Sequence, residues 1–104
     1  MSFTGNEEHD FPLAAAAELT KNYRVSSPTG STISHFFGKK AIQDILDQET
    51  CVGIRIYYAL DVDGQKQLIV VGANASENDL FQGKLAERSR ACPTMCSASN
   101  PLNS

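Results

Sequence analysis

An alternating segment, followed by a turn and a second apolar run, restricts the fold of this chain more than any other feature. Between residues 51 and 60, large apolar side chains occupy every second position, and their face consists of Val52, Ile54, Ile56, Tyr58 and Leu60. A period of two is typical of a half-buried β-strand. Residues 61–66 have turn composition, and residues 67–73 are a β-branched run. The pattern predicts an antiparallel hairpin of strands 51–60 and 67–73.

The second strand of this hairpin is apolar on both faces. Ile69 and Val71 lie on one face, and Leu68 and Val70 lie on the other. Because both faces of such a strand have to be covered, we expect it to be central in its sheet or covered twice. A two-stranded hairpin alone is marginal in water, so we also expect a third strand near residues 84–90.

Two helices are predicted before the hairpin. Asp10 and Pro12 suit a helix start, and apolar side chains then recur every four positions, which indicates a helix over residues 10–25. Residues 34–48 have a contiguous apolar face opposite a charged one. The apolar face consists of Phe37, Gly38, Ala41, Ile42, Ile45 and Leu46.

These elements predict an α+β fold with two N-terminal helices packed on one face of a small antiparallel sheet. We expect residues 1–9 to be a flexible acidic arm and residues 10–91 to be a single domain. Residues 92–104 are rich in Cys, Ser, Asn and Pro and are expected to form a tail that contributes little to the core.

Composition excludes several classes of protein. The chain has 104 residues, of which 41% are hydrophobic and 20% charged, as expected for one small globular domain. Its net charge of -3 gives no basic surface for nucleic acid. We find no apolar run long enough to span a membrane and no secretory signal pattern, and so expect a cytoplasmic protein.

The three cysteines leave several alternatives open. Cys92 and Cys96 are separated by three residues, which is not the spacing of thioredoxin-type redox sites or zinc knuckles. They could form a local disulfide, bind zinc together with Cys51 or His35, or remain reduced. An odd number of cysteines differs from the even number of small secreted frameworks, so reduced thiols are the default expectation.

Asp61 and Asp63, followed by Gly64, match the beginning of a calcium-binding loop. The twelfth position of that loop would be Gly72, where an EF-hand requires a bidentate Glu. We therefore interpret residues 61–66 as the turn of the hairpin, with Gly64 at a positive φ.

No catalytic constellation is visible in the sequence. His35 could act as a general base, but no nucleophile or orienting group accompanies it at a defined spacing. We therefore expect a non-enzymatic interaction or assembly module without a cofactor, whose partner is a second copy of the chain or another protein. Its candidate interface residues are Arg55, Tyr57, Ile69 and Val71. The alternative is a thiol or zinc site built from Cys92 and Cys96 with Cys51 or His35.

A resemblance to other sequences is carried by three segments, 35–39, 51–58 and 71–74, and by Cys92 followed by Pro93. In these residues the chain resembles a set of small uncharacterised bacterial proteins of about 100 residues. The resemblance spans residues 20–96. It implies a compact unit and a bacterial cytoplasmic or envelope setting, with no activity, cofactor or binding site.

Overall fold

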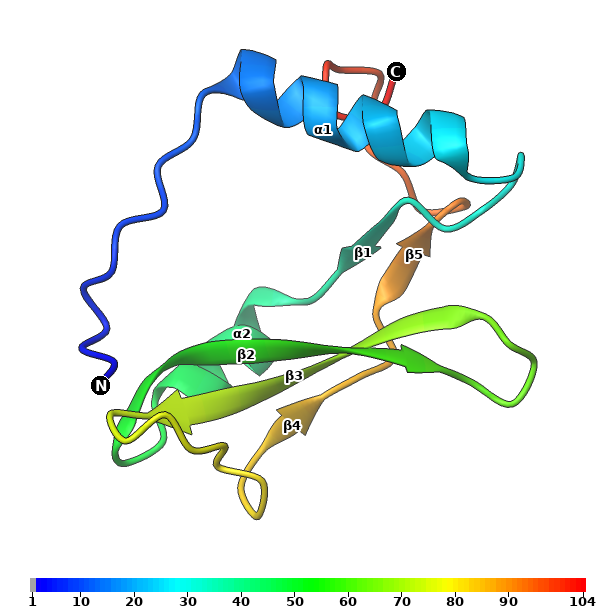
Figure 1. The fold of residues 1–104 in the computed structure, drawn as a ribbon. Coiled ribbons are helices and arrows are strands. Elements are labelled where there is room, and N and C mark those ends of the chain that lie inside the picture. Colours follow the sequence, from blue (N-terminus) through cyan, green and yellow to red (C-terminus); the bar gives the residue numbers. More distant parts are fainter. Residues whose placement is uncertain (1) are drawn as a thin grey trace. The chain divides into compact units, whose positions relative to one another are not determined.

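The computed structural model describes residues 2–104, which form two compact units (Figure 1). The first unit comprises residues 2–7 and Phe36–Ser89, and the second comprises Glu8–His35 and Arg90–Ser104. Met1 of the expected acidic arm lies outside the described residues. Helices and antiparallel strands are both present, which confirms the predicted α+β class. In the described part of the chain, no helix has the length and apolarity needed to cross a membrane.

The predicted hairpin is confirmed. Strands β2 (Cys51–Leu60) and β3 (Lys66–Asn74) pair antiparallel. In the turn between them, Oδ1 of Asp61 accepts hydrogen bonds from the backbone N–H groups of Asp63 and Gln65, both at 2.9 Å. Gly64 has a φ of 78°, a conformation that favours glycine. The interpretation of residues 61–66 as a turn is therefore confirmed.

The position of β3 in its sheet also agrees with the sequence. The strand order is β2-β3-β4, so β3 is central and β4 (Leu85–Ala86) covers its second edge. The predicted third strand over 84–90 is wrong in extent, because β4 ends at Ala86 and β5 (Arg90–Cys92) belongs to another sheet. Arg88 has a φ of 59°, a left-handed conformation that an extended strand cannot contain.

Helix α2 (Lys39–Leu46) covers one face of this sheet and provides the core of the first unit. Ile45 and Val70 are each 1% exposed and pack with Ala86, and Phe37 and Ile42 pack against this cluster. The large buried side chains of this unit therefore come from the predicted apolar face of the helix and from the central strand.

The predicted start of this helix at residue 34 is wrong. Residues Ser34–Phe36 form strand β1, which pairs with β5 in a two-stranded sheet. The backbone N–H of Ile33 donates to the carbonyl oxygen of Cys92 at 2.8 Å. Pairing with a distant strand therefore overrides the local helical pattern, and the helix begins only after the extended residue Gly38.

The second unit contains α1 (Leu13–Ser26), β5 and the first two residues of β1, whose last residue, Phe36, begins the continuous part of the first unit. Helix α1 confirms the helix predicted over 10–25, although it begins after Pro12. Helix α2 lies in the unit that contains the hairpin sheet, and its packing on this sheet is confirmed, whereas α1 belongs to the second unit and its packing on the sheet stays a prediction. Nη1 and Nη2 of Arg24 donate to the carbonyl oxygens of Leu102 and Ser104, each at 2.6 Å, and so hold the C-terminal residues near the end of α1.

Candidate functional site

Strand β2 forms one edge of the three-stranded sheet. Among residues 2–104, its only strand neighbour in the sheet is β3. The strand is ten residues long, contains no proline and has a single charged residue, Arg55. In Figure 1 the β2–β3 hairpin extends well past α2 toward its turn. A long edge strand presents backbone donors and acceptors that can pair with a further strand.

Four apolar side chains of β2 are exposed and lie on one face of the strand; we refer to them as the apolar row. They are Ile54 at 41%, Ile56 at 51%, Tyr58 at 94% and Leu60 at 71% exposure. Ile56 is paired with Val70, which packs against Ile45 of α2. Since directly opposed residues of a sheet share a face, the apolar row lies on the α2 side and continues the core toward the open edge.

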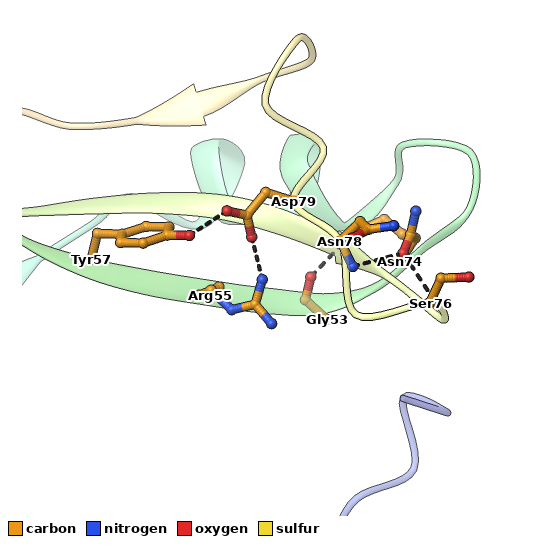
Figure 2. A network of polar contacts seen from close by, with 8 residues as sticks. Gly53, Arg55, Tyr57, Asn74, Ser76, Asn78 and Asp79 are labelled. Carbon is orange, nitrogen blue, oxygen red and sulfur yellow. Dashed lines mark hydrogen bonds and ion pairs between the residues drawn. The ribbon is translucent and has the colours of Figure 1, made fainter. Parts of the chain in front are cut away.

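The opposite face of β2 contains a polar triad of Arg55, Tyr57 and Asp79. Nη1 of Arg55 donates to Oδ1 of Asp79, and the hydroxyl of Tyr57 donates to Oδ2 of the same carboxylate (Figure 2). Arg55 and Tyr57 share this face because they are two positions apart on one strand. Both carboxylate oxygens therefore have a donor from β2.

A turn after β3 places Asp79 above these two residues. Oδ1 of Asn74 accepts from the backbone N–H groups of Ser76 and Asn78, each at 3.0 Å (Figure 2). Glu77 has a φ of 70°, which completes the reversal. Asp79 then forms an isolated bridge with Ala73 of β3. The Asn74 side chain thus determines how the chain returns toward β2.

The hydrogen bonds of the triad shift the pKa values of all three groups. The hydroxyl of Tyr57, followed by the guanidinium of Arg55, lowers the pKa of Asp79 below its ordinary value. The hydrogen bond to Asp79 raises the pKa of Tyr57 and that of Arg55. Each shift favours a neutral tyrosine, a charged arginine and a charged aspartate, which is the combination that these hydrogen bonds require.

Residues 2–7, which we refer to as the N-terminal segment, lie against the beginning of β2. The backbone N–H of Phe3 donates to the carbonyl oxygen of Ala75 at 3.0 Å, and the guanidinium carbon of Arg55 lies 5.6 Å from the centre of the Phe3 ring. Gly5 has a φ of 87°, and a Cβ atom at this position would lie 2.9 Å from the carbonyl oxygen of Val52. The N-terminal segment therefore covers the first part of β2, and its Phe3 ring makes a cation–π contact with the guanidinium of Arg55.

The four predicted interface residues share one face of the sheet, because Arg55 is paired with Val71 and Tyr57 with Ile69. Their exposure differs. Tyr57 is 47% exposed, whereas Val71 is only 3% exposed and is part of the interior. Ile69 and Arg55 are half-buried. The surface that this face offers thus consists mainly of the polar triad, and the larger apolar surface of β2 is on the other side.

The predicted thiol and metal residues are divided between the two units. Cys92 and Cys96 form a disulfide in the second unit, so the default expectation of reduced thiols is wrong for this pair. His35 lies on β1 of the same unit, and its partial burial lowers its pKa. Cys51 is a free, half-buried cysteine of the first unit, and its Sγ donates to the carbonyl oxygen of Gly53 at 3.2 Å. Within residues 2–104 no three His, Cys, Asp or Glu side chains are grouped as metal ligands.

An open hollow of about 410 Å³ lies beside the polar triad, between the end of α2 and residues 79–83. Nε2 of Gln48 donates to the carbonyl oxygen of Ile45 at 2.9 Å, and its Oε1 accepts from the backbone N–H of Lys84 at 2.8 Å. Asp79 is bound by Arg55 and Tyr57. The amide of Gln48 and the carboxylate of Asp79, two of the polar groups of this hollow, are thus occupied by the protein itself.

Two residues of the site were not identified from the sequence as partners of Arg55. Asp79 is 24 positions from Arg55, and Phe3 lies in a segment expected to be flexible. The only sequence signal for Asp79 is the polar turn between β3 and β4, and Phe3 is the one large apolar residue in an otherwise polar segment of residues 2–9.

No family model, curated protein or solved structure matches the chain.

Proposed function

We propose that this chain is a small, non-enzymatic interaction module that pairs the open edge of β2 with another strand. The observation that carries the proposal is the position of β2, a ten-residue edge strand with four exposed apolar side chains on one face. Pairing would supply partners for the outer backbone groups of β2 and remove the apolar row from water. Burial of apolar surface stabilises by about 25 cal/mol per Å², and main-chain hydrogen bonds provide the geometry of strand addition.

The charges of the site support this function. A charged side chain at a strand edge is a common device against unwanted pairing. On β2 the only such side chain, Arg55, is bound to Asp79, and Tyr57 shares the same carboxylate. The triad therefore removes the electrostatic obstacle that an unpaired arginine would present to an approaching strand.

Amide hydrogen exchange at a dilution where the protein does not associate tests whether the edge is open. We expect fast exchange for those amides of residues 54–60 that point away from β3 and slow exchange for central β3. Raising the protein concentration, or adding the partner, should then protect the fast amides of β2. Slow exchange along the whole of β2 in the dilute protein would show that the edge is already covered and would remove the proposal.

The disulfide favours the thiol form of the alternative function. Cys92 is 4% exposed, whereas Cys96 is exposed, so an external thiolate would reach the sulfur of Cys96 first. Attack there forms a mixed disulfide and releases the Cys92 thiolate; the second thiol of an external dithiol then completes the exchange, leaving both cysteines reduced and the dithiol oxidised. Equilibration with glutathione or dithiothreitol buffers, followed by mass spectrometry after thiol alkylation, measures this exchange. A pair that remains oxidised throughout the cellular range of potentials would be structural.

A further inference from the structure

We propose that the strand that pairs with β2 is β2 of a second copy of the chain, antiparallel to the first, with the twofold axis at Tyr57. This inference rests on the proposed function, because it names the occupant of the same open edge. The result would be one continuous six-stranded sheet in the order β4-β3-β2-β2-β3-β4. Such an interface is isologous, since each copy contributes the same surface.

The uncovered length of β2 determines the register. The N-terminal segment approaches the carbonyl group of Val52 through Gly5, and the strand ends at Leu60. The register of β2 is irregular between Cys51 and Gly53, so the regular stretch available for pairing is 54–60, and Tyr57 is at its centre. Two such stretches overlap completely only when Ile54 of one copy faces Leu60 of the other.

In this register the apolar rows of the two copies meet on one face of the joined sheet. A twofold axis perpendicular to the sheet keeps the α2 side of each copy on the same side. Ile56 then faces Tyr58 of the second copy, and cross-strand pairs of aromatic and β-branched side chains are favourable. The most exposed member of the row, Tyr58 at 94%, gains the most from this contact.

Charge favours a copy of the chain over an oppositely charged partner. The one cation of β2 is neutralised within its own unit, so the edge offers a charged partner no unpaired group to recognise. The same neutralisation allows two identical edges to approach. The register also separates the two arginines. Arg55 of one copy faces Ala59 of the other copy, and the Arg55 of that other copy lies four strand positions, about 14 Å, further along the strand. This separation exceeds the Debye length of about 8 Å at physiological ionic strength.

A parallel arrangement of the same two edges does not bring the apolar rows together. Within the described chain only one edge of β2 is free, so two parallel copies would have to be related by a 180° rotation about the strand direction. That rotation exchanges the two faces of the sheet, and the apolar rows would lie on opposite faces. The antiparallel arrangement about Tyr57 keeps both rows on one face.

Cysteine pairs placed across the proposed axis test the inference in the full chain. The background is Cys51→Ser, which removes the free thiol. Ile56→Cys and Tyr58→Cys are prepared as separate proteins, oxidised alone and as an equimolar mixture, and analysed by non-reducing electrophoresis and mass spectrometry. Val62→Cys, fully exposed in the turn beyond the strand, reports random collision.

We expect the mixture to form the disulfide-linked heterodimer several-fold faster than either variant alone or Val62→Cys forms a homodimer. Directly opposed positions are about 4.5–5.5 Å apart at Cβ, whereas diagonal positions are about 7–8 Å apart. Equal rates in all samples would overturn the second copy as the occupant. If the outward-pointing amides of residues 54–60 nevertheless exchange their hydrogens fast in the dilute protein, the open edge and the proposed function remain, and only the second copy is excluded. If these amides exchange slowly in the dilute protein, the proposed function and the second copy are both excluded.

Discussion

Arg55 on β2 is paired with Asp79, which follows β3, and this pair neutralises the only charge on the open edge strand. The two side chains are 32% and 20% exposed, so the pair is partly shielded from water. Tyr57 donates to the second oxygen of the same carboxylate. Without Asp79 the edge strand would present an unpaired cation, whereas with Asp79 the charge of Arg55 is neutralised within its own unit.

Replacement of the shared carboxylate should weaken association. Asp79→Asn leaves the charge of Arg55 uncompensated, and a charge at a strand edge opposes pairing. We expect the concentration of half-maximal association to rise, and to rise more at low than at high salt. Asp63→Asn, in the hairpin turn, removes an equal charge outside the triad and serves as the control. Equal association of the two variants would show that the triad does not control the edge.

The triad should stabilise the folded protein only within a defined pH range. The folded-state pKa of Asp79 lies below its ordinary value of 3.8. The stabilisation that its carboxylate provides is therefore complete above that value and is lost as the pH falls through the folded pKa. The pKa of Tyr57 is raised above 10.0, so its contribution is present below that value and is lost as the pH rises through the folded pKa.

Thermal unfolding as a function of pH measures this window. The difference in midpoint between the native protein and Asp79→Asn should shrink at the acid end, and the difference from Tyr57→Phe should shrink at the alkaline end. Glu7, Asp44 and Asp61 also have lowered pKa values and are unchanged in both variants, so the difference isolates the triad. A difference that is constant across the whole range would contradict the hydrogen-bond assignment.

The hairpin and its central strand were predictable because their signals are local. Alternation over 51–60, the carboxylate and glycine of the 61–66 turn, and the two apolar faces of β3 each reflect nearest-neighbour geometry. The start of α2 was not predictable in the same way. Residues 34–36 have helical periodicity, but they pair with β5, more than 50 positions away. Tertiary pairing overrides a local pattern when it satisfies the backbone equally well.

The residues of the candidate site also differ in whether the sequence alone could predict their positions. Arg55 and Tyr57 were placed on one strand face by the period of two, and the structure puts them there. Their partner Asp79 depends on a turn built by the side chain of Asn74, which no periodicity reveals. Val71 was named as a candidate interface residue and is buried, because a strand that is apolar on both faces does not reveal which of its side chains the rest of the chain covers.

The core offers a direct test of the first unit. Ile45→Ala should reduce the free energy of unfolding by about 2–5 kcal/mol, because the side chain is almost fully buried against Val70. Lys40→Ala, on the exposed side of the same helix, should change it little. Urea unfolding followed by circular dichroism measures both variants. An insensitive Ile45 would contradict the packing of α2 on the sheet.

Thiol titration tests the cysteine assignment. Unreduced protein, unfolded in guanidinium chloride, should show one reactive thiol from Cys51, and the reduced protein should show three. The same samples should differ in mass by two hydrogens. Three thiols in the unreduced protein would show that Cys92 and Cys96 are not bonded, and the thiol form of the alternative function would lose its supporting observation.

The concentration dependence of the molecular mass tests most directly whether the open edge of β2 is the interaction surface. Sedimentation equilibrium should show association of the native protein, loss of association in Tyr58→Lys, and retention in Val62→Lys. Both substitutions replace a highly exposed apolar residue with the same cation, but only Tyr58 belongs to the pairing strand. Association that survives Tyr58→Lys unchanged, or that Val62→Lys abolishes equally, would contradict the assignment of the β2 edge as the interaction surface.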